Sequence, residues 1–458
     1  MAAAAGLGVA LAAGGCGWIL GLDEFVDAPP PGSGGGGGCA TPADCLGGEH
    51  ATATCADGVC GLDCEEGFAD CTDAPGCETA TRDDRQNCGG CGVTCGAFCA
   101  AGECNDPVDI AAGPLGSSVC ALLKDGSVWC WGLLPGPTVA GEVTPTPTRI
   151  DLPMAAIQIA TGSGLTGSAQ FYAGHLCALL EDHTVQCWGS NQYGQLGIGS
   201  TEPSATPVDS GLSGIATIAL GITNTCAIDD RGRLFCWGQN ATGAVGNNTT
   251  ADVLAPTHIM DSTAQVAVGQ LHACAVMLDS SLRCWGGNVF GVLGLGDGAP
   301  QQVLEPTQVG TWSAYQEVAC SGSHTCARRT NGVACWGYNA GGQLGLGDTV
   351  DRNTPQLVNI SVVDVLATGG FHTGAMIEGD IYMWGENAYR QLGTDEPFDV
   401  TAPTQISLSS VAKVALGSNF SCALTQEGTV LCWGRNTNGQ LGDGTTADRP
   451  TPVSVVWP

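Results

Sequence analysis

Residues 409–455 read SSVAKVALGSNFSCALTQEGTVLCWGRNTNGQLGDGTTADRPTPVSV, and this stretch carries the pattern that organises most of the chain. It contains four short apolar segments separated by turns rich in Gly, Asn, Asp and Pro. Short apolar segments separated by such turns predict four short β-strands. Because one small sheet cannot bury both of its faces alone, a unit of this kind must stack against neighbouring units.

The same unit recurs seven times between residues 106 and 458. Its landmark is Trp followed by Gly, with spacings of 57, 49, 48, 51, 48 and 49 residues, at Trp131, Trp188, Trp237, Trp285, Trp336, Trp384 and Trp433. Four strands in a unit of roughly 50 residues are typical of a β-propeller blade. Seven blades can close into a ring without a long open edge. The sequence therefore predicts an all-β fold, a seven-bladed β-propeller of four-stranded blades.

The motifs within each unit resemble those of a known family. GSHTCA at 322–327, CWGYN at 335–339 and GQLGLGD at 342–348 are similar to regulator of chromosome condensation repeats. The resemblance implies the seven-bladed fold over roughly three quarters of the chain. It leaves the activity open, because members of that family serve nucleotide exchange on a small GTPase, ultraviolet sensing or secreted inhibition of β-lactamase.

Six of the seven repeats carry two cysteines, one in the second strand and one just before the Trp. The pairs are Cys120 and Cys130, Cys177 and Cys187, Cys226 and Cys236, Cys274 and Cys284, Cys326 and Cys335, and Cys422 and Cys432. The sixth repeat has Gly374 and Met383 there, so both cysteines are lost together. Residues on either side of a tight turn face each other across antiparallel strands, which predicts one disulfide in each of the six blades. Two thiolates in each separate blade make no four-ligand metal site. Cys320 is left over.

The chain begins with MAAAAGLGVALAAGGCG, a short apolar run that ends at Cys16. This shape is typical of a lipoprotein export signal whose cysteine is lipidated, and a cleaved secretory signal is the alternative. We therefore expect residues 1–27 to be the export signal and mature N-terminus, and residues 28–38 to be a Pro/Gly linker. The protein is then exported, either as an outer-membrane or cell-surface lipoprotein or in secreted form, with a lipid anchor as its one membrane contact.

Residues 39–105 form a separate small cysteine-rich module with 12 cysteines. In an oxidising compartment this even number predicts six disulfides of unknown connectivity. The spacing of Cys88, Cys91, Cys95 and Cys99 also suits zinc or an iron-sulfur cluster. The stretch GFADCTDAPGCETATRDDRQNCGGCGVTC resembles modules of predicted bacterial surface proteins, which brings no known activity.

Charge argues against one class of partner. With 14 Lys and Arg against 44 Asp and Glu, the formal net charge is -30, and such a surface repels phosphate backbones. We expect no nucleic-acid partner, no cofactor and no bound metal. His175, His272, His324 and His372 lie two residues before a blade cysteine position; we expect each to hydrogen-bond its own blade's backbone, with a shared metal site at one end of the channel as the alternative.

The candidate binding residues are aromatic. Phe171 and Tyr172 lie in a loop between Ile159 and Cys177 that is about ten residues longer than in the third repeat. Tyr193, Phe290 and Tyr389 occupy one equivalent position in alternate repeats, where packing onto their own blade is the alternative.

No catalytic constellation is recognisable, so we predict a monomeric, non-enzymatic propeller that binds a protein or glycan through its rim loops. The alternatives are an extracellular hydrolase or lyase with a site in the channel, and a secreted enzyme inhibitor. We also expect Val453 to Val456 to join the sheet around Cys120 and Cys130 and so clasp the ring.

Overall fold

The computed structural model describes residues 50–56, 59–65, 68–69, 79–80, 83, 85–88, 94–100, 103–134, 142–162, 174–394 and 399–458. The chain divides into two compact units, the first of which contains the hairpin of β1 (Ala51–Ala56) and β2 (Val59–Cys64). The second unit contains two further short strand pairs and the propeller. The short pairs are β3 (Phe68–Ala69) with β4 (Thr79–Ala80) and β5 (Phe98–Ala100) with β6 (Glu103–Asn105).

Seven four-stranded antiparallel sheets follow in chain order. Blade 1 consists of β7 (Pro107–Ala112), β8 (Ser118–Leu123), β9 (Val128–Leu134) and β10 (Glu142–Ile150). Blade 2 consists of β11 (Ala156–Gly162), β12 (His175–Leu180), β13 (Val185–Gly189) and β14 (Ser204–Asp209). Blade 3 consists of β15 (Ile215–Leu220), β16 (Asn224–Asp229), β17 (Leu234–Gly238) and β18 (Val253–Met260). Blades 4 and 5 are β19 (Thr263–Val268), β20 (His272–Met277), β21 (Leu282–Gly287) and β22 (Gln302–Gln308); β23 (Tyr315–Cys320), β24 (His324–Arg329), β25 (Gly332–Gly337) and β26 (Arg352–Leu357). Blades 6 and 7 are β27 (Val365–Thr368), β28 (His372–Ile377), β29 (Asp380–Gly385) and β30 (Val400–Gln405); β31 (Val411–Leu416), β32 (Phe420–Thr425), β33 (Val430–Gly434) and β34 (Arg449–Ser454).

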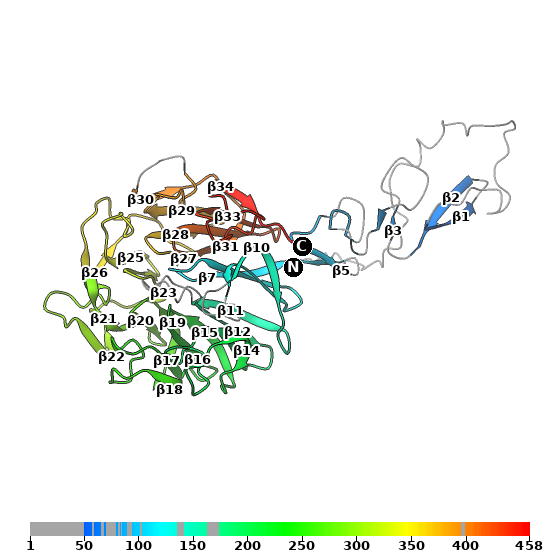
Figure 1. Cartoon of the computed structure of the whole chain (residues 1–458). Coiled ribbons are helices and arrows are strands. Elements are labelled where there is room, and N and C mark those ends of the chain that lie inside the picture. Colours follow the sequence, from blue (N-terminus) through cyan, green and yellow to red (C-terminus); the bar gives the residue numbers. More distant parts are fainter. Residues whose placement is uncertain are drawn as a thin grey trace, which may run out of the picture. The chain divides into compact units, whose positions relative to one another are not determined.

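The first strands of the blades surround a central axis. Each contacts the first strand of the next blade, in the closed cycle β7, β11, β15, β19, β23, β27, β31 and back to β7. Figure 1 shows the resulting ring, with the last blade beside the first. The predicted all-β, seven-bladed propeller is therefore confirmed. Among the described residues the one helical segment is the 3-10 turn η2 (Val289–Gly291), and none of them forms a helix that could span a membrane.

Burial along each blade explains which strand lies where. The second strands are almost entirely buried, and β12 and β16 are buried at every position, in keeping with runs like HLCALL. The fourth strands are half-buried or exposed at nearly every position, and every one of them contains proline. Proline cannot donate to a strand ladder and is tolerated where its missing N–H would face solvent. The position of proline in the repeat therefore marks the outer edge of each blade.

Nearly every interface between blades has the same two components. At six of the seven interfaces, one blade contributes its cysteine pair and the next blade contributes its Trp: Cys177 and Cys187 pack with Trp237, for example. At the seventh, Met383 of blade 6 packs with Trp433. The seven Trp side chains are 0–3% exposed. Since side chains alternate along a strand, neighbouring Cys and Trp residues point to opposite faces of the sheet. The prediction that the Trp residues fill the contacts with adjoining blades is confirmed.

The ring does not close as expected from the sequence. β34 pairs with β33 in blade 7, with Val453 opposite Cys432, so the predicted clasp between the C-terminal strand and blade 1 is wrong. Blade 1 has four strands of its own because β7 begins directly after the cysteine-rich segment. Blades 1 and 7 instead meet face to face in one hydrophobic cluster, which includes Trp131 and Trp457.

Candidate binding surface on one rim of the propeller

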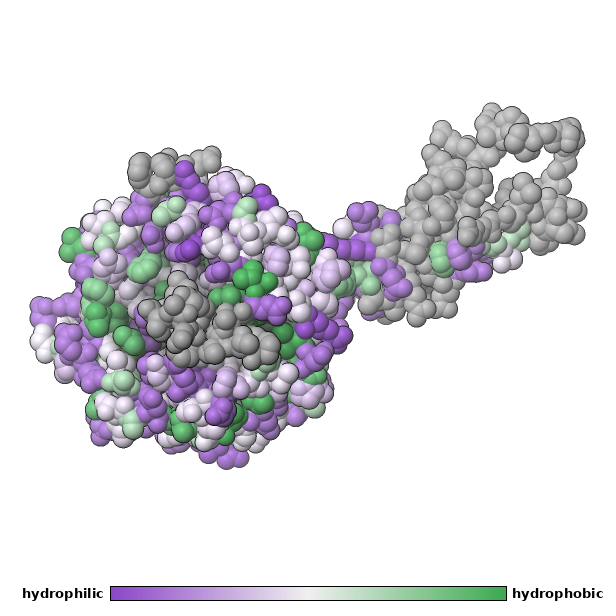
Figure 2. Space-filling model, in the orientation of Figure 1, coloured by the Kyte–Doolittle hydropathy of each residue, from purple (hydrophilic) through white to green (hydrophobic). Residues whose placement is uncertain are grey.

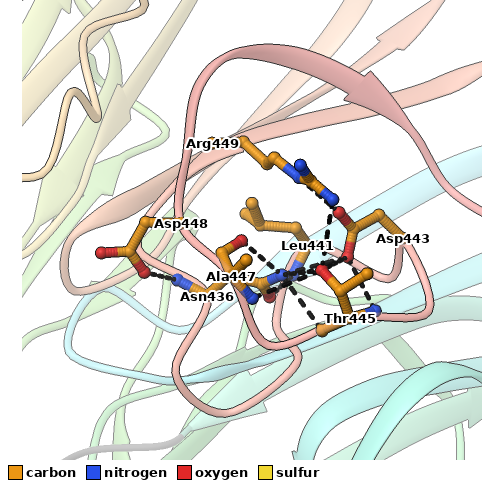
Figure 3. Close-up of polar contacts among 7 residues, drawn as sticks. All are labelled: Asn436, Leu441, Asp443, Thr445, Ala447, Asp448 and Arg449. Atoms are coloured by element: carbon orange, nitrogen blue, oxygen red, sulfur yellow. Dashed lines mark hydrogen bonds and ion pairs between the residues drawn. The ribbon is translucent and has the colours of Figure 1, made fainter.

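The long loop between the third and fourth strands of a blade is held by an asparagine. In blade 7, Asn436 Oδ1 accepts a hydrogen bond from Leu441 N at 3.0 Å, and its Nδ2 donates to the carbonyls of Thr445 and Ala447 (Figure 3). Asp448 accepts from the Asn436 backbone N–H at 2.7 Å. Equivalent Asn side chains lie in blades 2 to 6, at Asn191, Asn240, Asn288, Asn339 and Asn387. These loops are therefore rigid platforms, and they project at one rim of the ring, which we call the loop face.

The blades are also joined by polar contacts just beneath the loop face. The carbonyl of Gln343 in blade 5 accepts from two groups of blade 6, the Trp384 Nε1–H at 3.0 Å and the Thr373 hydroxyl at 2.8 Å. Indole-to-carbonyl bonds of this kind also fix Trp131, Trp237, Trp285, Trp336 and Trp433. The loops of blades 2 to 7 are thereby tied to the core of the following blade.

The four histidines reach across the same interfaces. Their Nε2 atoms lie 2.7, 2.9, 2.9 and 3.1 Å from hydroxyls of the next blade, in the pairs His175 and Thr225, His272 and Thr325, His324 and Thr373, and His372 and Ser421. The hydrogen bonds of Nε2 thus run to the next blade and not, as expected, to the backbone of the histidine's own blade. Within the described residues, the possible metal-ligating groups of three contain at most one of these histidines, so the four do not converge.

The protonation state of these histidines follows from their partners. Each hydroxyl already donates its single hydrogen to a loop carbonyl, so the imidazole Nε2–H must be the donor. Burial lowers the pKa of His175 and His272 to about 4, and that of His324 and His372 to about 3. The imidazoles are neutral structural links at physiological pH.

Three aromatic side chains from consecutive blades form a row on the loop face. Phe290 in blade 4 is 50% exposed, and its ring centroid lies 4.7 Å from that of Tyr338 in blade 5. Tyr338 in turn lies 6.2 Å from Phe371 in blade 6, edge to face. We call Phe290, Tyr338 and Phe371 the aromatic arc. Figure 2 shows the apolar residues of the displayed side as separate patches among hydrophilic ones.

The aromatic arc borders a shallow pocket of about 280 Å³ between blades 5 and 6, which we call the rim pocket. It is lined by Tyr338, Ala340, Gly341, Gln343, Phe371, Glu386 and Asp399. Burial raises the pKa of Glu386, and the negative charge of Asp399 raises it further. Among the described residues, no side chain pairs with the Glu386 carboxylate. The rim pocket thus combines two aromatic walls with unbalanced negative charge.

The candidate residues from the sequence do not all lie together. Phe290 belongs to the aromatic arc, whereas Tyr389 lies under the Arg435 guanidinium, whose Cζ is 4.9 Å from the ring centroid. Tyr193 is half-buried in the loop of blade 2. Phe171 and Tyr172 lie outside the described residues, as does Cys16.

Sequence reasoning missed Tyr338, Phe371 and Glu386. Tyr338 and Glu386 occupy the variable position of the motif Trp-Gly-x-Asn, and Phe371 directly precedes a buried histidine. A comparison of that variable position across the repeats would have singled out Tyr338 as its one aromatic residue.

The channel offers a second place for function, and polar residues do occur there. The third residues of the first strands link neighbouring blades: Gln158 bonds the backbone of Ile218, and Gln265 that of Val318. Three titratable residues occupy this position, Asp109, Glu317 and Lys413. Lys413 of blade 7 forms an ion pair with Asp109 of blade 1, and Glu317 forms one with Arg328. At the loop face, Leu115 of blade 1 reaches the glycines of blades 5 and 6 at 322 and 370.

In the cysteine-rich segment, Cys88 is disulfide-bonded to Cys99 and Cys95 to Cys104. Three of the four cysteines with metal-like spacing therefore have their sulfurs in disulfides, and Cys91 lies outside the described residues. In the blades, the six within-repeat pairs are bridged with Cα separations of 4.1 Å. Such close approach is typical of non-hydrogen-bonded antiparallel pairs.

Comparisons with known proteins agree with this architecture. Models of the Regulator of chromosome condensation (RCC1) repeat match residues 170–195, 215–244, 264–292 and 411–440 in one form, and 231–276, 281–328, 332–376, 378–424 and 427–458 in another. The Ultraviolet-B receptor UVR8 of Arabidopsis thaliana is 32% identical over 289 residues, which are 61% of this chain and 56% of the receptor. The chain thus spans about half the length of that relative.

Solved structures show the same fold at lower identity. Human WBSCR16 superposes with a TM-score of 0.62 at 23% identity, covering 72% of this chain and 95% of that one. Yeast RCC1 (Prp20), solved with Kap60 bound, has a TM-score of 0.62 at 19% identity, covering 77% of this chain and 84% of that one. The two repeat models together match more than half of the chain. The chain therefore belongs to the regulator of chromosome condensation (RCC1) repeat family.

Proposed function

We propose that this chain is a non-enzymatic binding propeller, exported to the cell surface or secreted, that engages a protein partner through the loop face. The observation that carries the proposal is the aromatic arc, which three consecutive blades build on rigid loops. Aromatic side chains held on a rigid scaffold are the residues that most often dominate protein interfaces. Because the loops are already ordered by their Asn caps, binding costs little loop ordering.

A protein partner is favoured over a glycan by two observations. The arc is flanked by the charged rim pocket, so recognition would combine apolar contact with charge. In addition, a solved propeller of the same fold, yeast RCC1 (Prp20), has the protein Kap60 bound. Export is supported by the sequence alone, through the apolar run before Cys16 and the many cysteines.

The alternative of a hydrolase or lyase finds its best support in Asp109, Glu317 and Lys413 on the channel strands. Each of these groups already has a partner of opposite charge. A secreted enzyme inhibitor is a special case of protein binding, and it would use the same surface.

The proposal is tested by capture of envelope and secreted proteins on the immobilised full chain. The double variant Phe290→Ser, Tyr338→Ser should lose at least about tenfold in affinity for a captured protein, since two hot-spot side chains are removed. Leu278→Ser is the matched control, because Leu278 is 66% exposed and lies in the β20–β21 turn at the opposite rim. Equal retention of partners by both variants would refute a binding role for the loop face.

A further inference from the structure

We infer that the rim pocket receives a lysine or arginine side chain from a basic segment of the partner protein. This inference rests on the proposed function and specifies the chemistry of the partner. The pocket is lined by Tyr338 of blade 5 and by Phe371, Glu386 and Asp399 of blade 6. Aromatic faces and carboxylates together form the setting in which cations bind best.

The charge in the rim pocket is not neutralised from within. One carboxylate oxygen of Asp399 accepts a hydrogen bond from the backbone N–H of Asn387, at 3.2 Å. Glu386 has no ion pair with any described residue, although burial and Asp399 both disfavour its charged form. A cation placed between these two carboxylates would remove their mutual repulsion. An anionic or purely apolar ligand would leave that repulsion in place.

The same loop face already holds one cation in this manner. In the neighbouring interface, the guanidinium of Arg435 from blade 7 lies over the ring of Tyr389 from blade 6. The rim pocket between blades 5 and 6 offers a similar aromatic surface, but the equivalent of Arg435 in blade 6 is Glu386. The chain thus supplies its own cation at one interface and a carboxylate at the next, where the cation must come from outside.

A hydrogen-bond donor completes the pocket. Gln343 is fully buried and lines it, and its Oε1 accepts from Gly341 N at 3.0 Å. Its Nε2 is buried and has no acceptor among the described residues, so a backbone carbonyl of the bound segment can satisfy it only once that segment displaces the groups that cover it. Gln391 in the next blade has an unpaired Nε2 as well. The specificity for a cation therefore comes from the aromatic and acidic groups, and Gln343 adds a contact to the peptide backbone.

The experiment measures binding of hexa-arginine, hexa-lysine and neutral hexa-citrulline peptides to the full chain at 0.15 M salt. A chain with a net charge of -30 attracts any cationic peptide, so the site must be separated from the general field. Glu386→Gln should weaken hexa-arginine binding by about 5- to 30-fold, and Phe371→Leu by about 3- to 10-fold. Glu305→Gln is the matched control, because it removes one exposed carboxylate of blade 4 outside the rim pocket.

Equal and small effects of Glu386→Gln and Glu305→Gln would overturn the inference, because binding would then reflect overall charge. Binding of hexa-citrulline as tight as that of hexa-arginine would also overturn it. If neither basic peptide binds while the variant Phe290→Ser, Tyr338→Ser still loses its captured partner, the cation site is wrong and the proposed function stands. Unchanged thermal midpoints of the variants establish that they are folded.

Discussion

The thioether of Met383 lies against Gly374, its cross-strand partner in blade 6: a methyl group placed on Gly374 would come within 2.9 Å of Met383 Sδ. These two residues hold the place of the cysteine pair in the other six blades. Met383 is 1% exposed and packs with Trp433 of blade 7. A long flexible side chain opposite a glycine therefore fills the space that a disulfide fills elsewhere.

This relationship predicts that blade 6 can accept a seventh disulfide. In the double variant Gly374→Cys, Met383→Cys, the two thiols should oxidise to each other, since the residues are paired in register between β28 and β29. A bridge closing a loop of about ten residues should add about 2 to 3 kcal/mol to the free energy of unfolding. Intact mass and urea unfolding check this. Two persistent free thiols after oxidation would show that blade 6 has a different geometry from its neighbours.

The native cysteines should be oxidised within blades, never between them. Peptide mapping without reduction should find Cys226 joined to Cys236 and Cys422 joined to Cys432, as in the structure. Replacing one such pair with alanines should cost about 2 to 3 kcal/mol while the ring stays folded, because Trp packing remains. Loss of all folded signal in a single-pair variant would contradict this view of the blades.

The remaining blade cysteine should be inert. Burial raises the pKa of the Cys320 thiol to about 12, and its side chain is shielded in the interface between blades 4 and 5. The thiolate is the reactive form, so Cys320 should resist iodoacetamide at pH 7.5 and should not exchange with the nearby Cys274–Cys284 bridge. Alkylation of Cys320 should appear only in denaturant. Rapid labelling of Cys320 in the native protein would show that its thiol is not buried.

The fold was predictable because the chain repeats itself. Comparison of the seven copies shows the strand pattern and the Trp positions. It also shows that both cysteines are lost together at Gly374 and Met383, which indicates that the two cysteines of the other repeats pair with each other. The aromatic arc was not predictable in this way. Tyr338, Phe371 and Glu386 occupy positions that differ between repeats, and they meet only because the ring places blades 5 and 6 side by side. Single-repeat patterns carry no information on such contacts.

Ring closure escaped prediction for a different reason. A last strand can complete either the first blade or the last one, and both arrangements use the same residues. The choice depends on whether the chain has a strand available for blade 1 before Cys120. Pro107–Ala112 supplies that strand, although its short run PVDIAA is a weak signal beside the repeats.

Acid should destabilise the ring through its buried histidines. Their pKa values are about 3 to 4 in the folded state, below the ordinary value of 6.5, so between pH 6.5 and 4 only the unfolded chain takes up their protons. The stability that depends on neutral imidazoles is complete above pH 6.5 and falls as the pH decreases, by up to about 1.4 kcal/mol per pH unit for each histidine. Urea unfolding between pH 8 and 4.5 measures this slope.

A substitution isolates the histidine contribution. His324→Asn should reduce the slope between pH 6.5 and 4.5, and asparagine is already accepted at the same position of blade 3, at Asn224. Carboxylates with lowered pKa, such as Asp229, reduce the stability mainly below pH 4. The raised pKa of Glu317 has the opposite effect, because its protonation favours the folded state as the pH falls. A slope that is the same in His324→Asn and in the unmodified chain would show that other groups cause the acid sensitivity.

Closure of the ring should depend on Trp457. Its ring centroid lies 6.1 Å from that of Trp131 and 5.5 Å from that of Phe98, so one side chain beyond the last strand joins blade 7 to blade 1 and to the cysteine-rich segment. The side chain is 7% exposed, and truncation of a buried Trp typically costs about 3 to 5 kcal/mol. Trp457→Ala should therefore lower the thermal midpoint and increase hydrogen exchange in β7 and β31, which meet at the closure. Val456→Ala, at a half-exposed neighbour, should change stability by less than about 0.5 kcal/mol. If Trp457→Ala melts like the unmodified protein, the contacts between Asp109 and Lys413 and between the faces of β7 and β31 are sufficient to close the ring.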